Sequence, residues 1–157
     1  MSLAKTVFQS PVHIFAFGFG SGLAPFAPGT FGTLAAIPLY WLLSFLPLWL
    51  YALVLLAAII FGIWLCGESA KRLGVPDHGG IVWDEFVGFW ITMLAAPSGL
   101  GWILVGFVLF RIFDIWKPWP IYIVDDKVKG GFGIMLDDMI AGAYAFIIMQ
   151  ILALFFG

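Results

Sequence analysis

Five apolar stretches dominate the pattern of hydrophobic and polar positions along the chain. A membrane-spanning helix needs about 20 apolar residues, with a range of about 17–25. Two of the stretches reach that length, and the other three do so only with flanking residues or a bend. The pattern therefore predicts an all-α fold, a polytopic membrane bundle of about five apolar helices. The stretches are residues 31–45, 48–66, 81–96, 102–116 and 139–156.

Proline and glycine indicate where these helices are interrupted. Pro38 and Pro47 are expected to divide the long apolar block into two helices, because proline breaks the helical hydrogen-bond ladder. Residues 11–32 are apolar but repeatedly interrupted by glycine and proline. Such a segment is expected to form a re-entrant or interfacial hairpin, and the choice between these two positions stays open for residues 11–29.

The composition agrees with a membrane protein of one domain, residues 1–157. The chain is 63% hydrophobic and 10% charged, with a mean hydropathy of +1.09, which lies outside the usual range of soluble proteins. It has no basic run, so no nucleic-acid partner is expected. The single cysteine, Cys66, excludes an intrachain disulfide. The N-terminus lacks the pattern of a cleaved signal peptide.

Basic residues predict the orientation of the bundle. They fall at alternate ends of the apolar stretches, whereas the connections near Pro47 and at residues 97–101 carry no charge. The positive-inside rule therefore places the N-terminus and the loops at 67–80 and 117–133 in the cytoplasm. The basic residues in question are Lys5, Lys71, Arg72, Lys117, Lys127 and Lys129.

Acidic and basic side chains gather at the same predicted membrane level. Two similar segments, Gly80–Glu85 and Gly133–Asp138, are expected to open the third and fifth helices, and Arg111-x-x-Asp114-x-x-Lys117 ends the fourth. An ionisable group at membrane depth costs at least about 2.5 kcal/mol on insertion scales. These groups therefore need partners, and the sequence predicts that they converge at the cytoplasmic edge.

Five carboxylates facing two cations leave an excess of negative charge that favours a divalent metal. Hard oxygen ligands suit Mg²⁺, so Mg²⁺ is the expected cofactor. Two simpler explanations stay open. Carboxylates at a helix N-terminus gain about 0.3–1 kcal/mol from its dipole, and the spacing of three allows an intrahelical ion pair. The five carboxylates are Asp84, Glu85, Asp114, Asp137 and Asp138, and the cations are Arg111 and Lys117.

Four further positions carry weaker predictions. Gly29 and Thr30 precede a predicted helix start, where free N–H groups can hold an anion, although Thr30 could equally be a plain N-cap. His78 lies in a loop just ahead of the first acidic pair, where it is either a proton-transfer group or a solvated loop histidine. His13 is expected at the membrane interface.

Two tempting motifs are weak. Cys66-x5-Arg72 matches the spacing of cysteine phosphatases, but Cys66 closes an apolar helix, where the helix dipole disfavours a thiolate. The glycine-rich run at residues 18–22 lacks the strand–helix unit of a nucleotide site.

Taken together, the motifs resemble the phosphatidylglycerophosphatase A family of bacterial membrane lipid phosphatases, and they occur in the expected order over residues 18–142. They are Gly18-Phe19-Gly20-Ser21-Gly22 with Ala27-Pro28-Gly29-Thr30, Ile81-Val82-Trp83-Asp84-Glu85, Phe110-Arg111-Ile112-Phe113-Asp114-Ile115-Trp116-Lys117-Pro118-Trp119-Pro120-Ile121, and Gly130-Gly131-Phe132-Gly133-Ile134-Met135-Leu136-Asp137-Asp138.

The resemblance implies Mg²⁺-dependent removal of the terminal phosphate from phosphatidylglycerophosphate, at the cytoplasmic face of the bacterial inner membrane. In this interpretation the five carboxylates hold one or two Mg²⁺ ions, and Arg111, Lys117 and Thr30, with Gly29 beside it, bind the phosphate. Either a water or an aspartate, Asp84 or Asp137, attacks the phosphorus. The oligomeric state is not predicted.

The main alternative is a small carboxylate-lined transporter or ion channel. A conduit needs polar groups near the midplane or on both sides of the membrane. Here the opposite face is nearly featureless, and only Thr92 and Gln150 offer such support. A third class, a small structural or assembly protein, does not require this many carboxylates at one level. The sequence favours the enzyme.

Overall fold

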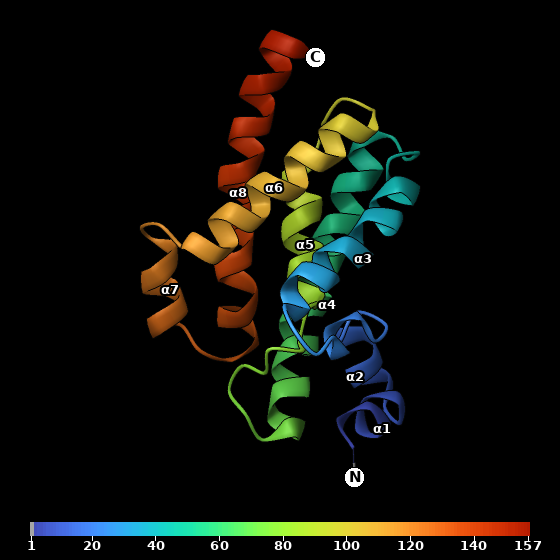
Figure 1. Cartoon of the computed structure of the whole chain (residues 1–157), viewed down its shortest axis with the longest axis vertical. Helices are drawn as coiled ribbons and strands as arrows, with labels where there is room; N and C mark the ends of the chain where they lie inside the picture. The colour runs from blue at the N-terminus through green and yellow to red at the C-terminus, as the bar shows by residue number, and fades with distance from the viewer. Residues whose placement is uncertain (1) are drawn as a thin grey trace.

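The fold is known from a computed structural model that describes residues 2–157, and it is all helical within that range (Figure 1). No strand occurs among the described residues, which confirms the all-α prediction. The helices are α1 (Leu3–Phe8), α2 (Pro11–Ala16), α3 (Pro28–Leu43), α4 (Leu48–Leu73), α5 (Trp83–Thr92), α6 (Leu100–Trp116), α7 (Ile121–Lys127) and α8 (Gly130–Phe156), with a 3₁₀ turn, η1 (Ser21–Leu23).

Two helices, α4 and α8, are long and apolar enough to cross a membrane. Within their most apolar stretches only 28% and 22% of the residues are buried. Their apolar side chains therefore face outward, unlike those of a core helix in a soluble protein. This outward apolar surface indicates a membrane protein.

Two predicted helix boundaries are wrong. Pro38 lies inside α3 and does not end it, so Pro47 alone separates α3 from α4. A single proline is tolerated where neighbouring helices support the freed backbone. The last helix begins at Gly130, ahead of the apolar stretch at residue 139, because three glycines among its first four residues and the pair Asp137 and Asp138 interrupt the apolar pattern.

Helix α5 lies at the centre of the fold, and nine of its ten residues are buried. It packs against α3, α4 and α8, and it runs in the same direction as α8 (Figure 1). Ten residues rise about 15 Å, which is about half the hydrocarbon thickness of a bilayer. Helix α5 is therefore a buried half-length helix.

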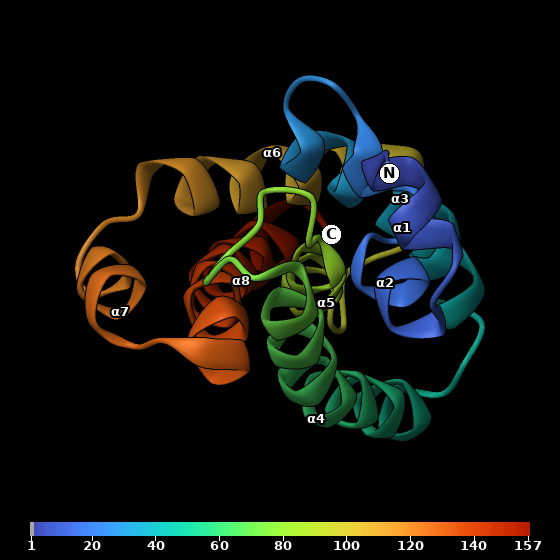
Figure 2. The same ribbon diagram turned by 90° about the horizontal axis from the view of Figure 1, so that it is seen from below.

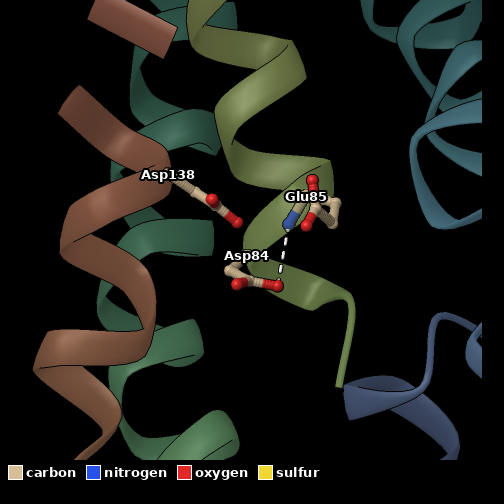
Figure 3. A group of neighbouring side chains, drawn as sticks. All are labelled: Asp84, Glu85 and Asp138. Atoms are coloured by element: carbon tan, nitrogen blue, oxygen red, sulfur yellow. Dashed lines mark hydrogen bonds between the residues drawn. The ribbon is translucent and has the colours of Figure 1, made fainter. Parts of the chain in front are cut away.

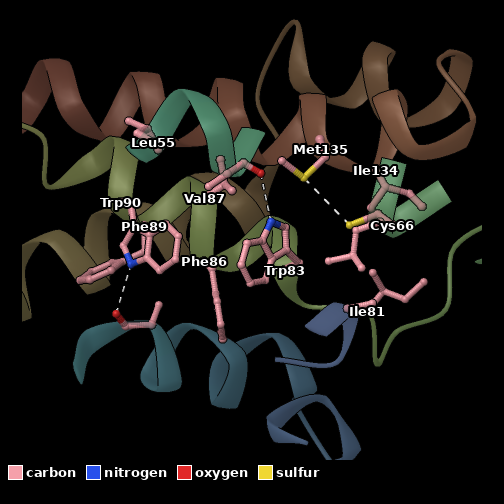
Figure 4. Close-up of a cluster of buried hydrophobic side chains, with 14 of the residues drawn as sticks. Leu55, Cys66, Ile81, Trp83, Phe86, Val87, Phe89, Trp90, Ile134 and Met135 are labelled. Atoms are coloured by element: carbon pink, nitrogen blue, oxygen red, sulfur yellow. Dashed lines mark hydrogen bonds between the residues drawn. The ribbon is translucent and has the colours of Figure 1, made fainter. Parts of the chain in front are cut away.

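Polar side chains within this core bond to backbone carbonyls and fix α5 laterally (Figure 4). The Trp83 indole donates to the Ala58 carbonyl at 3.1 Å, and the Trp90 indole donates to the Ala36 carbonyl at 3.2 Å. The Tyr51 hydroxyl donates to the Trp90 carbonyl at 2.6 Å. These bonds tie α5 to both α3 and α4.

The backbone carbonyls just after the C-terminal end of α5 also accept hydrogen bonds from a side chain. The Gln150 amide donates to the carbonyls of Leu94 at 3.1 Å and Ala95 at 3.4 Å. The Thr92 hydroxyl donates to the Gly88 carbonyl at 2.9 Å. Free backbone carbonyls are costly away from water, so Gln150 and Thr92 have a structural explanation that requires no transport path.

The glycine-rich N-terminal segment packs on the residues that lead into α5. The segment predicted as a hairpin consists of α2, η1 and a turn in which Gly18, Phe19 and Gly20 have φ of 58°, 59° and 101°. The Val82 N–H donates to the Ala16 carbonyl at 2.7 Å. A Cβ on Gly22 would lie 1.9 Å from the oxygen of Gly80. The glycines therefore serve close backbone contact and fix the approach to α5.

Figure 2 shows this end of the molecule face-on, with α1 and α2 on one side and α7 on the other. His13 of α2 is only 4% exposed, and its Nδ1 lies 2.8 Å from the Ser69 hydroxyl of α4. His13 is thus buried between two helices, and its position at the membrane interface stays a prediction. Its hydrogen bond to Ser69 explains why a polar ring is tolerated in this helix contact.

The close contact of α5 and α8 predicts that Gly142→Ala is destabilising. A Cβ on Gly142 would lie 2.5 Å from the oxygen of Gly88, so the helices must move apart, at a cost of about 1–3 kcal/mol. Gly101→Ala is the control, because its Cβ meets nothing within 4 Å. Thermal unfolding in detergent should show a lower Tm for Gly142→Ala alone. Equal Tm values for the two variants would contradict this packing.

The buried His13 predicts a loss of stability in mild acid. Burial, and secondarily the charge of Arg72, lowers the pKa of the His13 imidazole from its ordinary 6.5. The folded chain then holds fewer protons here than the unfolded chain, so stability falls as the pH decreases below about 6.5. Thermal unfolding followed from about pH 7.5 to about pH 5.5 should show a smaller decline for His13→Asn than for the unmodified chain. Parallel declines would refute this assignment.

Candidate active site

Three carboxylates from two helices meet beside the start of α5 (Figure 3). Asp84 and Glu85 lie in the first turn of α5, and Asp138 points toward them from α8. One oxygen of each lies within 4.8 Å of the others. The residues are 8%, 8% and 2% exposed. We call Asp84, Glu85 and Asp138 the carboxylate triad.

The two acidic pairs share one local geometry. The Glu85 N–H donates to Oδ1 of Asp84 at 3.0 Å, and the Asp138 N–H donates to Oδ1 of Asp137 at 2.9 Å. Only the first pair lies at a helix start. The second lies seven and eight residues into α8, about 10 Å along its axis. The predicted helix opening is therefore wrong for Asp137 and Asp138, and the helix dipole does not explain their position.

Arg111 joins three elements of the site. Its Nη1 donates to Asp114 on its own helix and, at 3.2 Å, to Oε2 of Glu85. Its Nη2 donates to the Thr30 hydroxyl of α3 at 3.3 Å. The intrahelical ion pair with Asp114 is thus present, but it is one part of a larger network. The Arg111 side chain is 14% exposed.

Lys117 pairs with the remaining carboxylates. Its Nζ lies 3.2 Å from Oδ2 of Asp137 and 3.9 Å from Oδ1 of Asp114. It follows α6 with a left-handed φ of 53°, which ends the helix. Burial acts to lower its pKa, but the neighbouring Asp137 and Asp114 outweigh this, so the pKa of Lys117 is raised and the ammonium stays charged. Its side chain is 30% exposed, more than that of Arg111.

The first turn of α3 borders this network. A Cβ on Gly29 would lie 3.2 Å from both Nη1 of Arg111 and Oε1 of Glu85, so glycine allows the turn to approach them closely. The N-cap of α3 is Ala27, which has a left-handed φ of 46°. The alternative that Thr30 is the N-cap is therefore wrong. The Thr30 backbone N–H donates to the Ala27 carbonyl at 3.0 Å, while its hydroxyl accepts from Arg111.

His78 lies outside the contacts of the carboxylate triad. It is in the loop between α4 and α5, where Nδ1 accepts from the Gly80 N–H at 2.9 Å. Its ring lies 5.4 Å from the ring of Phe17, between centroids. In the neutral ring this leaves the proton on Nε2. These contacts orient His78 toward the N-terminal segment, and its proton-transfer role stays a prediction.

Cys66 lies between buried apolar side chains, close to the acidic Asp84. It is fully buried, and its Sγ is 4.0 Å from Sδ of Met135. The charged groups that act on it within the described chain are acidic, Asp84 and Asp77. A reactive thiolate requires an electropositive, accessible setting, so the geometry supports the rejection of a cysteine phosphatase.

Sequence reasoning missed Thr33. Its side chain is fully buried, and the hydroxyl donates to the Gly29 carbonyl at 2.8 Å while lying 3.4 Å from Oε2 of Glu85. Residues four apart lie on one face of a helix, so the position of Thr33 relative to Gly29 was the available signal.

The donor set suits a hard divalent cation. The five carboxylates and two cations carry three excess negative charges when all are ionised. Oδ2 of Asp138 is buried and lacks a hydrogen-bond partner among residues 2–157. A buried carboxylate oxygen without a partner is strongly unfavourable. Oxygen ligands at this spacing fit Mg²⁺, and the triad is the part of the site that could hold it.

A buried acidic site between apolar helices, flanked by an arginine and a lysine, is the kind of site that a membrane phosphatase needs. A sequence model described as "Phosphatidylglycerophosphatase A" matches residues 14–153. The chain therefore belongs to the phosphatidylglycerophosphatase A family, as its motifs predicted.

Two individual relatives share the family name, and a third carries a different one. The chain is 56% identical over 135 residues to the phosphatidylglycerophosphatase A of Escherichia coli, covering 85% of this chain and 78% of the relative. It is 47% identical over 149 residues to that of Haemophilus influenzae, covering 94% and 91%. A Bacteroides thetaiotaomicron protein named "Putative phosphatidylinositol-3-phosphatase" is 43% identical over 142 residues, covering 85% and 88%. No solved structure matches the chain.

The network around Arg111 predicts that Arg111→Gln is strongly destabilising. Removing one partner of a buried ion pair costs about 3–5 kcal/mol, and here it leaves Glu85 and Asp114 without their cation. The control is Arg72→Gln, because the Arg72–Glu68 pair is exposed and such pairs contribute about 0–1 kcal/mol. In EDTA, the Tm should fall for Arg111→Gln and barely change for Arg72→Gln. Similar Tm values for both would show that the buried network is not stabilising.

Proposed function

We propose that this chain is a Mg²⁺-dependent phosphatidylglycerophosphatase, which removes the terminal phosphate of phosphatidylglycerophosphate to give phosphatidylglycerol and inorganic phosphate. Family membership supports the substrate, since two relatives carry that name. The observation that carries the metal dependence is the carboxylate triad, in which a buried oxygen of Asp138 has no partner among the described residues.

The carboxylates divide into two groups. Asp84, Glu85 and Asp138 would hold Mg²⁺, because their oxygens converge within 4.8 Å. Asp114 and Asp137 contact Arg111 and Lys117; they would complete the metal environment and orient the two cations. When bound, Mg²⁺ neutralises phosphate charge and lowers the pKa of a coordinated water.

The two cations would take different parts in binding the phosphomonoester. Lys117 is the more exposed and can reach a phosphate oxygen as a point charge. Arg111 is largely engaged by Asp114 and Glu85, so the bond it donates to Thr30 is the one most readily exchanged for a phosphate oxygen. Gly29 leaves space beside that bond.

The attacking group is a water in this proposal. Of the two aspartates considered as covalent nucleophiles, Asp137 is paired with Lys117, and Asp84 accepts a bond from the Glu85 N–H. Carboxylates held in this way are better suited to bind a metal or to accept a proton from water than to attack phosphorus. His78 remains a candidate for proton transfer only if its loop moves toward the site.

The proposed setting is the bacterial inner membrane, in which about five apolar helices are embedded, α4 and α8 as full spans, with the site open to the cytoplasm. Helix α1, the end of α4 and the start of α8 lie at one end of the molecule (Figure 1), and this end carries Lys5, Lys71 and Arg72. The positive-inside rule supports a cytoplasmic position for it. A lipid phosphate at headgroup level could then reach the site without leaving the bilayer.

A transporter or channel is not favoured. Its support at sequence level was Thr92 and Gln150, and both side chains bond to backbone carbonyls around the end of α5. The charged groups instead gather in one network around the triad.

The activity proposal predicts Mg²⁺-dependent phosphate release that requires Asp138. Purified protein in detergent should release phosphate from phosphatidylglycerophosphate with Mg²⁺, lose activity in EDTA and regain it with excess Mg²⁺. Asp138→Asn should lower kcat by at least about 100-fold, because it removes a charged group from the metal site.

Two matched variants complete this experiment. Asp126→Asn changes an exposed acidic residue of α7 and should retain activity, as should Cys66→Ser. Wild-type turnover in Asp138→Asn, or phosphate release that is insensitive to EDTA, would refute the metal site. Loss of activity only in Cys66→Ser would favour the cysteine route instead.

A further inference from the structure

The structure assigns a role to Thr33: we propose that its hydroxyl orients Glu85 for binding the cation, which makes Thr33 a positioning residue of the site. This inference rests on the proposed metal-dependent function. It concerns a residue with no charge and no exposed surface, which the motifs of the sequence did not single out.

Two donors from different helices reach the same oxygen of Glu85. Nη1 of Arg111 lies 3.2 Å from Oε2, and the Thr33 hydroxyl lies 3.4 Å from it. Oε1 accepts no hydrogen bond from any other residue of the described chain. Arg111 and Thr33 thus approach Oε2 from two sides, which restricts the orientation of the carboxylate and leaves Oε1 to face another partner.

The Thr33 hydroxyl has two acceptors within reach and one hydrogen. The nearer is the Gly29 carbonyl at 2.8 Å, one helical turn back along α3. The other is the Glu85 carboxylate. Thr33 therefore links the first turn of α3, which borders the phosphate site, to a member of the carboxylate triad. Groups that hold a metal ligand in place typically change metal affinity by about 10–100-fold when removed.

The simpler explanation is an ordinary bond from a helical threonine to the carbonyl four residues back. The chain contains a matched example of that bond. Thr92 is equally buried and donates to the Gly88 carbonyl at 2.9 Å. Its hydroxyl reaches no carboxylate among residues 2–157. The two threonines thus share burial and backbone bonding, and differ in the contact with Glu85.

The test compares Thr33→Val with Thr92→Val, since valine keeps the shape and removes the hydroxyl. Two readouts are followed against Mg²⁺ concentration: the rise in Tm relative to EDTA, and phosphate release from phosphatidylglycerophosphate. Thr33→Val should raise the Mg²⁺ concentration for half of each effect by about tenfold, with the KM for lipid unchanged. Thr92→Val should match the unmodified chain in both.

Thr33→Ser is the rescue variant, because it restores the hydroxyl, and its Mg²⁺ requirement should return to within about twofold of the unmodified chain. If Thr33→Val does not fold, Thr33→Ala and Thr92→Ala replace the pair. An equal Mg²⁺ requirement in the Thr33 and Thr92 variants overturns this inference while leaving the proposed function intact. No effect of Mg²⁺ on the Tm or activity of the unmodified chain would instead overturn the proposed function, and this inference with it.

Discussion

The burial of Asp84 and Glu85 at the start of a helix enclosed by apolar neighbours is the constraint on which the rest of the structure depends. Charged groups in such a place are strongly unfavourable unless other charges or ligands compensate them. Arg111 compensates Glu85 directly, and Asp138 adds a further carboxylate instead of a cation. Lys117 pairs with Asp137 and Asp114, and the carboxylates still outnumber the two cations, which is the basis of the proposed Mg²⁺ site.

Several features of the fold follow from the need to hold these carboxylates in register. Helix α5 is only ten residues long. The backbone carbonyl of Leu94, just after its C-terminal end, accepts a hydrogen bond from the Gln150 side chain. The near end of α5 is fixed by the N-terminal segment, which approaches through Gly22 and bonds to Val82. The glycines of that segment therefore serve the site indirectly, by setting where α5 begins.

Much of the site could be predicted from the sequence, because charged residues are rare in this chain and each stands near the end of an apolar stretch. The positions of the charged residues at the ends of these stretches, with the positive-inside rule, predicted that seven of them lie at one membrane level, and the structure brings them into one network. They are Asp84, Glu85, Arg111, Asp114, Lys117, Asp137 and Asp138. The sequence motifs that contain these residues also predicted the family.

What could not be predicted depends on contacts between helices. The start of α8 at Gly130 was missed because three of its first four residues are glycine, which has a low helix propensity, and the acidic pair then interrupts the apolar pattern. Pro38 lies inside α3, although the low helix propensity of proline predicts a helix end there. Thr33 lacks charge, and its relation to Glu85 exists only once α3 packs against α5.

The central claim is that the carboxylate triad binds a divalent cation, and direct binding of Mn²⁺ as a substitute for Mg²⁺ tests it without reference to activity. Electron paramagnetic resonance of the purified protein in detergent should show bound Mn²⁺ that Mg²⁺ displaces, and Asp138→Asn should bind it far more weakly. Undiminished Mn²⁺ binding by Asp138→Asn, in a variant that remains folded, would contradict the account.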